Sequence, residues 1–183
     1  MLAYPCSGRT LTTCSEFGVF YSFNGTQQSA STAAAVAYIG PSMTPYQNLN
    51  AGFRYYEVDA DTFNIIDSLT YYANISNTQD WTRAGDVTWE FEYSARKTYD
   101  PENKLLSSPS APLSPAFWHE VTQNIRNDNA TYRTYTDLRT KKFRPYEQST
   151  AEDRERTICG LNSMSIPIFE TCLGSMEGTG SFL

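Results

Sequence analysis

Histidine is the scarcest of the residues that commonly do chemistry, because the 183-residue chain contains only one, His119. A two-metal hydrolase needs several His and Asp ligands around its ions, so one imidazole excludes a complete site of that kind. No G-x-S-x-G motif occurs, which excludes a serine hydrolase built on a nucleophile elbow. The chain by itself therefore has no recognisable catalytic set.

Positive charge and long apolar runs are also scarce. The 14 Lys and Arg are outnumbered by 20 Asp and Glu, for a net charge of −6, and this argues against nucleic-acid binding. The basic residues gather only in 139–144, "RTKKFR", which we interpret as a solvated helix end. No run approaches the roughly 18 apolar residues of a membrane span. The first ten residues show no signal peptide.

Four cysteines, Cys6, Cys14, Cys159 and Cys172, allow three disulfide pairings, of which we favour Cys159–Cys172. Closing that loop would stabilise the fold by about 3 kcal/mol. A disulfide implies an oxidising compartment, in conflict with the missing signal peptide. The cysteine spacings match no zinc knuckle.

Three N-x-S/T sequons make Asn24, Asn74 and Asn129 candidates for glycosylation. A chain this rich in Ser and Thr yields about as many by chance, so the sequons by themselves prove little. Aromatic residues make up 14% of the chain, which suits a β-rich core or a pocket for a flat or greasy ligand.

Strand patterns occupy the first half of the chain. Segments 16–23 and 35–40 each predict a strand, the second mostly buried, and 53–75 predicts a hairpin that turns at 59–64. Segment 88–99 predicts a strand that ends in a helical turn, with Trp89, Phe91 and Tyr93 on one face.

Helical patterns occupy the second half, after a Pro/Ser-rich connector. Ser114 and Pro115 are typical of a helix start, and the apolar stripe predicts one helix to about Lys141. A short helix follows at 151–161. His119 falls off the stripe, and Gln123 stands where an H-E-x-x-H helix needs its second histidine. We therefore expect His119 on the helix surface or flank. The pattern as a whole predicts a mixed α/β domain.

Two motifs carry a family resemblance. The segments "AYIGPSMTPY" (37–46) and "NAGFRYYEVD" (50–59), with twelve residues between Cys159 and Cys172, resemble the C-terminal region of the acid sphingomyelinase and sphingomyelinase-like phosphodiesterase family. The resemblance extends from near Glu16 to about Cys172. It implies an α+β fold in which the C-terminal strands of a calcineurin-like metallophosphoesterase β-sandwich precede a helical subdomain.

This resemblance also divides the chain. It implies a non-matching leader (1–15), the β-rich part of the phosphoesterase domain (16–99), a connector (100–113), a helical region (114–175) and a tail (176–183).

Enzymes of this family bind two metal ions, usually zinc, through motifs that lie N-terminal to this region. The last motif, G-H-x-H, stands just before the strand at 16–23, where this chain reads "SGRTLTTCSEFG" without a histidine. The resemblance therefore transfers no catalytic residue, no metal ligand and no cofactor to this chain. Zinc is expected in the full-length family only.

Other family positions do transfer. Tyr46 matches a tyrosine at the cleft rim, where a ring can face a choline-type cation and a hydroxyl can bond a phosphate. A loop tyrosine that packs on its neighbours is an equally good interpretation. Arg54 matches an arginine that we expect to be structural and paired with a carboxylate. Trp118 and His119 match a scaffold dipeptide that opens a helix, and the terminal cysteines match the family's last disulfide.

Three hypotheses follow. The chain is the C-terminal part of a secreted phosphodiesterase and is inactive by itself, the parent reaction being hydrolysis of phosphoesters such as sphingomyelin. Alternatively, it is a piece of an active hydrolase whose longer form supplies the metal motifs. Alternatively, it is a non-catalytic module that binds lipid or protein. The resemblance implies a secreted, extracellular or lysosome- or vacuole-like location and a phospholipid or other phosphoester as the parent enzyme's partner, and leaves the oligomeric state open.

Overall fold

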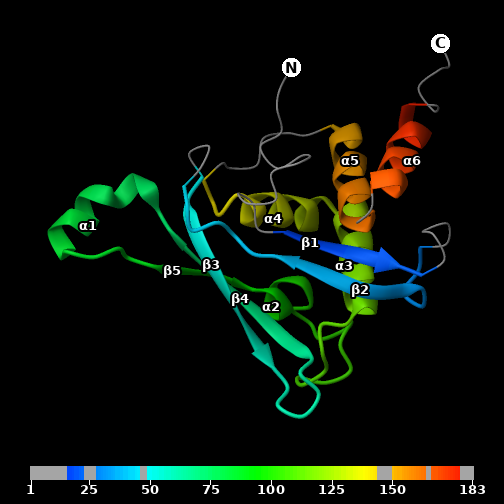
Figure 1. The fold of residues 1–183 in the computed structure, drawn as a ribbon, viewed down its shortest axis with the longest axis horizontal. Coiled ribbons are helices and arrows are strands. Elements are labelled where there is room, and N and C mark those ends of the chain that lie inside the picture. Colours follow the sequence, from blue (N-terminus) through cyan, green and yellow to red (C-terminus); the bar gives the residue numbers. More distant parts are fainter. Residues whose placement is uncertain (1–15, 23–27, 46–48, 144–149, 164–165, 178–183) are drawn as a thin grey trace. The chain divides into compact units, whose positions relative to one another are not determined.

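The computed structural model describes residues 16–22, 28–45, 49–143, 150–163 and 166–177 (Figure 1). The chain divides into two compact units that interleave along the sequence. The first contains Ile39–Leu113 and Arg133–Tyr146, and the second contains Phe17–Tyr38, Ser114–Tyr132 and Glu147–Leu183. Strands and helices occur in both units, which confirms the mixed α/β class.

A three-stranded antiparallel sheet forms the centre of the first unit (Figure 1). Its strands are β3 (Ala51–Val58), β4 (Ile65–Ala73) and β5 (Glu90–Ser94), in the order β3-β4-β5. The hairpin expected at 53–75 is confirmed. Its turn is closed by Asp59, whose Oδ1 accepts bonds of 2.8 Å from both the amide and the hydroxyl of Thr62.

The pairing of β4 with β5 contains a β-bulge. Tyr93 lies opposite Thr70, but Phe91 lies opposite Tyr71, so β5 has one extra residue, Glu92. A bulge breaks the two-residue alternation of a strand. The expectation that Phe91 and Tyr93 share a face is therefore wrong: Phe91 is 49% exposed and Tyr93 is 8% exposed.

Short helices complete the first unit. The 3-10 helix η3 (Ile75–Asn77) and helix α1 (Thr78–Ala84) were not predicted. Helix α2 (Ala95–Tyr99) confirms the expected helical turn after β5, and its Ser94 cap accepts a bond from the Lys97 amide. Apolar side chains from the sheet, α2 and the following segments form the core of this unit: Leu49, Tyr72, Ala73, Tyr93, Ala95, Tyr99, Leu106, Leu113, Tyr135 and Leu138.

The second unit begins with a two-stranded sheet of β1 (Glu16–Tyr21) and β2 (Ala33–Ile39), where both strands were expected. The expectation that β2 is mostly buried is wrong, because its residues are half-buried or exposed. Each strand of a two-stranded sheet is an edge strand, and an apolar run cannot distinguish an edge strand from a covered one.

The long helix expected from 114 to 141 is two helices, α3 (Pro115–Asn127) and α4 (Asn129–Arg139). Asp128 interrupts them with an extended backbone at φ −116° and ψ 126°. Its Oδ2 accepts bonds of 2.7 Å from the amide and the hydroxyl of Thr131, as an N-cap does. The predicted helix start is confirmed, because Ser114 caps the Phe117 amide at 3.2 Å.

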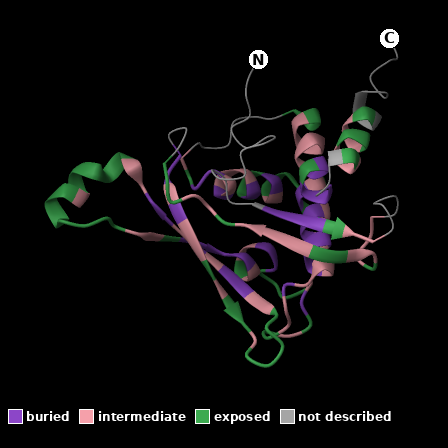
Figure 2. Ribbon diagram, viewed as in Figure 1, coloured by how far each residue is buried: buried purple, intermediate pink, exposed green. Residues whose placement is uncertain are grey.

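Helix α5 (Ala151–Asn162) confirms the short C-terminal helix and begins with a capping box of Thr150 and Asp153. Helix α6 (Ile166–Glu177) follows. A disulfide joins Cys159 to Cys172, the pairing that the sequence favours. The core of this unit is formed mainly by α3, which is buried over much of its length in Figure 2, together with β1 and α5. Among the described residues, no helix has the length and apolarity to cross a membrane.

Candidate functional site

Several residues named from the sequence cannot be placed. Tyr46, Asn24, Cys6 and Cys14 lie outside the described residues. Asn74 and Asn129 are described, and in each the side-chain oxygen accepts a bond, from the Ser76 amide and from Arg154 respectively. Glycosylation modifies the side-chain nitrogen instead, so these contacts leave both sequons as predictions.

His119 lies on α3 and is buried, with 6% exposure, so the expected position on the helix surface is wrong. Its Nδ1 is 2.8 Å from the hydroxyl of Tyr21, which donates to Oδ1 of Asn162 at 3.1 Å. Because the one hydroxyl proton goes to Asn162, Nδ1 donates to Tyr21. Burial lowers the pKa of His119 and raises that of Tyr21 to about 12, so both groups are neutral at pH 7.

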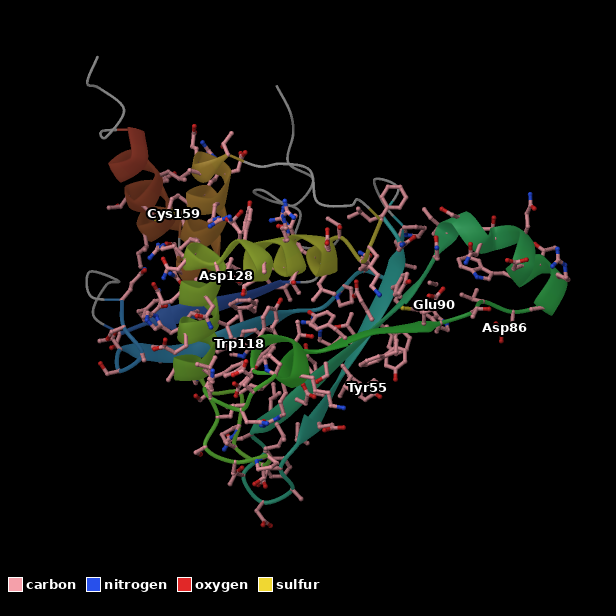
Figure 3. The ribbon with its side chains drawn as sticks, turned by 180° about the vertical axis from the view of Figure 1, so that it is seen from behind. Tyr55, Asp86, Glu90, Trp118, Asp128 and Cys159 are labelled. Atoms are coloured by element: carbon pink, nitrogen blue, oxygen red, sulfur yellow. A yellow bond between two sulfur atoms is a disulfide. The ribbon has the colours of Figure 1, made fainter. Side chains whose placement is uncertain are left out.

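This chain of hydrogen bonds joins α3, β1 and α5 within the second unit. The neighbouring Trp118 has a comparable role, because its Nε1 donates to the Tyr38 hydroxyl at 2.9 Å and its ring lies 4.3 Å from that of Phe17 (Trp118 is labelled in Figure 3). The contacts of both side chains fit the expectation that the dipeptide is scaffold.

A pair of zinc ions does not fit these residues. The chain's single imidazole is buried and bonded to Tyr21. Within the described ranges, no three His, Cys, Asp or Glu side chains are grouped as a metal site requires.

Arg54 is on β3, on the buried side of the three-stranded sheet. Its Nε donates to the Thr70 hydroxyl at 2.9 Å, and its Nη2 donates to the Tyr93 hydroxyl at 2.7 Å. The guanidinium also lies over the Tyr93 ring, 5.8 Å from its centroid. These contacts join all three strands. Both of these partners are hydroxyl groups, so the expected pairing of Arg54 with a carboxylate stays a prediction.

The sequence analysis missed a buried ionisable cluster beside Arg54. Glu92, the extra residue of the bulge, is 8% exposed, and neither carboxylate oxygen has a hydrogen-bond partner among the described residues. Burial raises the pKa of Glu92 to about 8, although nearby cations oppose the rise. These cations are Lys142, Lys141 and Arg54. Glu92 is thus a neutral carboxyl group at pH 7.

Lys141 is the second member of this cluster and is fully buried, with 0% exposure. The expectation that 139–144 is solvated is therefore wrong at this position. Burial lowers the pKa of Lys141 to about 8. The buried side chain of Asn50 donates to the Lys141 carbonyl at 2.8 Å and fixes this segment, in which Lys141 and Lys142 have φ values of 53° and 55°.

Glycine at position 52 lets the lysine approach the sheet. A Cβ added to Gly52 would lie 2.7 Å from the Lys141 side chain and 3.1 Å from the Tyr71 carbonyl. The cluster is thus enclosed, and its burial keeps the carboxyl and amino groups away from a large substrate. We assign this cluster no catalytic step.

The opposite side of the same sheet bears a row of aromatic rings. Phe53 and Tyr71 stack at 5.3 Å, and Tyr55 stacks on Tyr71 at 5.7 Å. Phe91 meets Tyr71 edge-on at 5.3 Å, and Trp89 meets Phe53 edge-on at 4.9 Å. We call these five side chains the aromatic face; Tyr55 is labelled in Figure 3. The aromatic content of the sequence indicated such a cluster, but not its position.

Comparison with known proteins places the chain among phosphodiesterases, although no family model matches it. It is 31% identical to human sphingomyelin phosphodiesterase over 148 residues, which are 79% of this chain and 21% of the relative. It is 26% identical to sphingomyelin phosphodiesterase A of Dictyostelium discoideum, over 75% of this chain and 21% of that relative.

Human acid sphingomyelinase-like phosphodiesterase 3b is 24% identical over 83% of this chain and 32% of its own length. The chain thus spans between 15% and 32% of the length of these and other curated relatives. The chain belongs to the family of sphingomyelin phosphodiesterases and acid sphingomyelinase-like phosphodiesterases.

Proposed function

We propose that the chain is the C-terminal part of an acid-sphingomyelinase-like phosphodiesterase and is inactive by itself. The parent reaction would be metal-dependent hydrolysis of a phosphoester such as sphingomyelin. The observation that carries the proposal is the similarity to sphingomyelin phosphodiesterases over 75–79% of this chain. The likeness of segments 37–46 and 50–59 to motifs near the C-terminus of the family supports the position within the parent protein.

In the parent enzyme, a calcineurin-like core would hold two zinc ions, which supply an activated water. The residues of this chain would act around that core rather than in it. His119 is committed to Tyr21, and Glu92 and Lys141 are enclosed beneath the sheet. This chain would therefore contribute structural support and part of the molecular surface to the parent enzyme. An active enzyme would need a longer form of the protein that supplies the metal-binding motifs.

The disulfide supports an oxidising location for the protein. Cys159 and Cys172 join two helices, and disulfides persist chiefly in secreted, extracellular or lumenal proteins. Two sequon residues, Asn74 on η3's cap and Asn129 at the start of α4, are at least partly exposed. We propose a secreted or lysosome- or vacuole-like glycoprotein, tested by the shift in gel mobility that a glycosidase causes after expression in a secretory host.

A segment exchange tests the proposed function. The 148 matching residues of human sphingomyelin phosphodiesterase would be replaced by those of this chain, and the control would close the same deletion with a Gly/Ser linker. We expect the exchange to hydrolyse sphingomyelin in the presence of zinc and the linker control to be inactive. A folded, secreted exchange protein as inactive as the control would contradict the proposal.

The isolated chain provides the second half of this test. Elemental analysis should find no stoichiometric zinc, and a generic phosphodiester substrate should not be turned over. Tightly held zinc together with turnover by the purified 183-residue chain would contradict the claim that it is inactive by itself.

A further inference from the structure

Helix α1 lies at the end of an exposed segment that joins β4 to β5 (Figure 1). No side chain of η3 or α1 is buried, and Figure 2 shows α1 exposed over most of its length. Within α1 only Trp81 is half-buried. Opening of this segment would therefore leave the core of the first unit intact.

The interactions that hold α1 in helical form are weak. The helix has seven residues, and its N-cap Asn77 makes no side-chain capping bond. A helix this short is marginal in water, because few hydrogen bonds offset the cost of its first turn. The ion pair between Arg83 and Asp80 adds little, since these side chains are 81% and 66% exposed. We therefore expect α1 to open while the rest of the unit stays folded.

Such an opening is what a protease requires, because proteolysis acts on transiently opened chain and prefers exposed connections. Arg83 offers the guanidinium that the specificity pocket of a trypsin-like protease binds through a carboxylate. Ala84 and Gly85 follow, and neither has a side chain that would obstruct the protease.

We propose that the peptide bond between Arg83 and Ala84 is a cleavage site for trypsin-like serine proteases, and that the two pieces remain associated after the cut. The C–N bond breaks and one water is consumed. The hydroxyl of this water joins the Arg83 carbonyl carbon, and its proton joins the Ala84 nitrogen. The site needs neither zinc nor the rest of the parent enzyme, so the inference goes beyond the proposed function.

Lys104 provides a contrast within the same unit. Its side chain is 76% exposed, nearly as much as that of Arg83. However, the carboxylate of Asp100 accepts bonds of 2.7 to 3.0 Å from the backbone amides of residues 104–106, and Leu106 is buried. A protease reaches this backbone only after these bonds break and Leu106 is exposed. Exposure of a basic side chain is thus not enough to make a cleavage site.

Limited trypsin digestion of the full chain tests the site, with new N-termini counted by mass spectrometry. We expect the N-terminus at Ala84 to form at least about tenfold faster than that at Leu105, because it needs only local opening. Lys104→Gln is the matched control and should leave the rate at Arg83 unchanged, whereas Arg83→Gln should abolish that cut. Equal rates at Arg83 and Lys104 in the unaltered chain would overturn the proposal.

Urea provides a second measurement, which does not depend on the folding of any variant. The rate of cleavage at Arg83 should hardly change below the unfolding transition, since local opening exposes little new surface. The rate at Lys104 should rise steeply with urea, because it requires opening of the unit's core. A parallel rise at both positions would show that α1 opens only when the unit unfolds, and this would contradict the proposal.

Contacts across the cut should hold the two pieces together. Strand β4 in the first piece pairs with β5 in the second. The Leu113 amide donates to the Ile65 carbonyl at 2.8 Å, and Nη2 of Arg96 donates to the Ile66 carbonyl at 2.8 Å. We expect the cut chain to elute with the uncut chain in size-exclusion chromatography and to keep its circular dichroism spectrum. Separation of the pieces without denaturant would refute the proposed association.

Discussion

Each side of the sheet β3-β4-β5 departs from the usual distribution of residues at a few positions. The buried side holds Arg54 and Glu92, next to the fully buried Lys141, whereas the exposed side holds Tyr55 and Phe91. Burial of a charge and exposure of a large ring both reduce stability compared with the reverse arrangement. This comparison indicates that the sheet is not optimised for stability alone. Substitutions on the buried side should lower the free energy of unfolding markedly, whereas substitutions on the exposed side should change it little.

Arg54→Ala should have the largest effect, because it removes the donor that joins Thr70 and Tyr93. We expect the free energy of unfolding to fall by about 2–4 kcal/mol, since two hydroxyl groups lose a partner and a cavity opens. Urea denaturation followed by circular dichroism measures this. The control is Arg83→Ala, whose side chain is 81% exposed in a surface ion pair with Asp80. If Arg54→Ala lowers the free energy of unfolding no more than Arg83→Ala does, Arg54 has no structural role.

Glu92→Gln should change how stability depends on pH. The folded pKa of Glu92, about 8, lies above its ordinary value of 4.5, so the folded state binds the proton more tightly. Its contribution to stability is complete below pH 4.5 and is lost as the pH rises through 8. The slope in this window is at most about 1.4 kcal/mol per pH unit.

The glutamine variant should therefore gain on the unaltered chain as the pH rises from 5 to 8. Urea denaturation at several pH values measures the difference, in which the titration of other groups cancels. Lys141 affects stability in a separate pH range. Its pKa in the folded state, about 8, lies below the ordinary 10.5, so its contribution to the free energy of unfolding increases as the pH rises from 8 to 10.5. Parallel curves for the two chains between pH 5 and 8 would mean that Glu92 is not held neutral.

Gly52→Ala tests how closely the buried side is packed. The new methyl group would lie 2.7 Å from the Lys141 side chain and 3.1 Å from the Tyr71 carbonyl, which cannot withdraw easily. We expect a loss of about 1–3 kcal/mol by urea denaturation. Gly40→Ala is the control, because a Cβ at Gly40 meets nothing within 4 Å. Similar effects at both positions would argue against tight packing around Lys141.

Local patterns predicted much of the fold but less of the buried side of the sheet. The hairpin, the Ser114 cap and the C-terminal helix depend on neighbours in the sequence, and all are confirmed. The long helix is interrupted at Asp128, whose side chain accepts a bond from the Thr131 amide and so caps a new helix. The apolar stripe continues across this position and therefore predicted a single helix. The alternation of apolar and polar residues in segment 88–99 did not predict the β-bulge at Glu92.

The properties of the candidate sites depend on partners far away in the sequence. His119 is buried against Tyr21, 98 residues earlier, and Lys141 is held by Asn50, 91 residues earlier. Helical periodicity predicted that His119 lies beside the apolar stripe, and charge predicted that Lys141 lies in solvent. Both predictions were wrong because neither pattern carries information about tertiary contacts. The family resemblance, by contrast, depends on short motifs and could be recognised from the sequence.

Phe91→Thr should have the smallest effect on stability and so sharpens the contrast between the two sides. Phe91 is 49% exposed, and threonine suits a strand, so we expect the free energy of unfolding to change by less than about 0.5 kcal/mol. Loss of the edge-on contact between the Phe91 and Tyr71 rings should lower the free energy of unfolding only slightly. Thermal unfolding by circular dichroism measures it. A fall as large as that of Arg54→Ala would show that the Phe91 ring stabilises the fold despite its exposure.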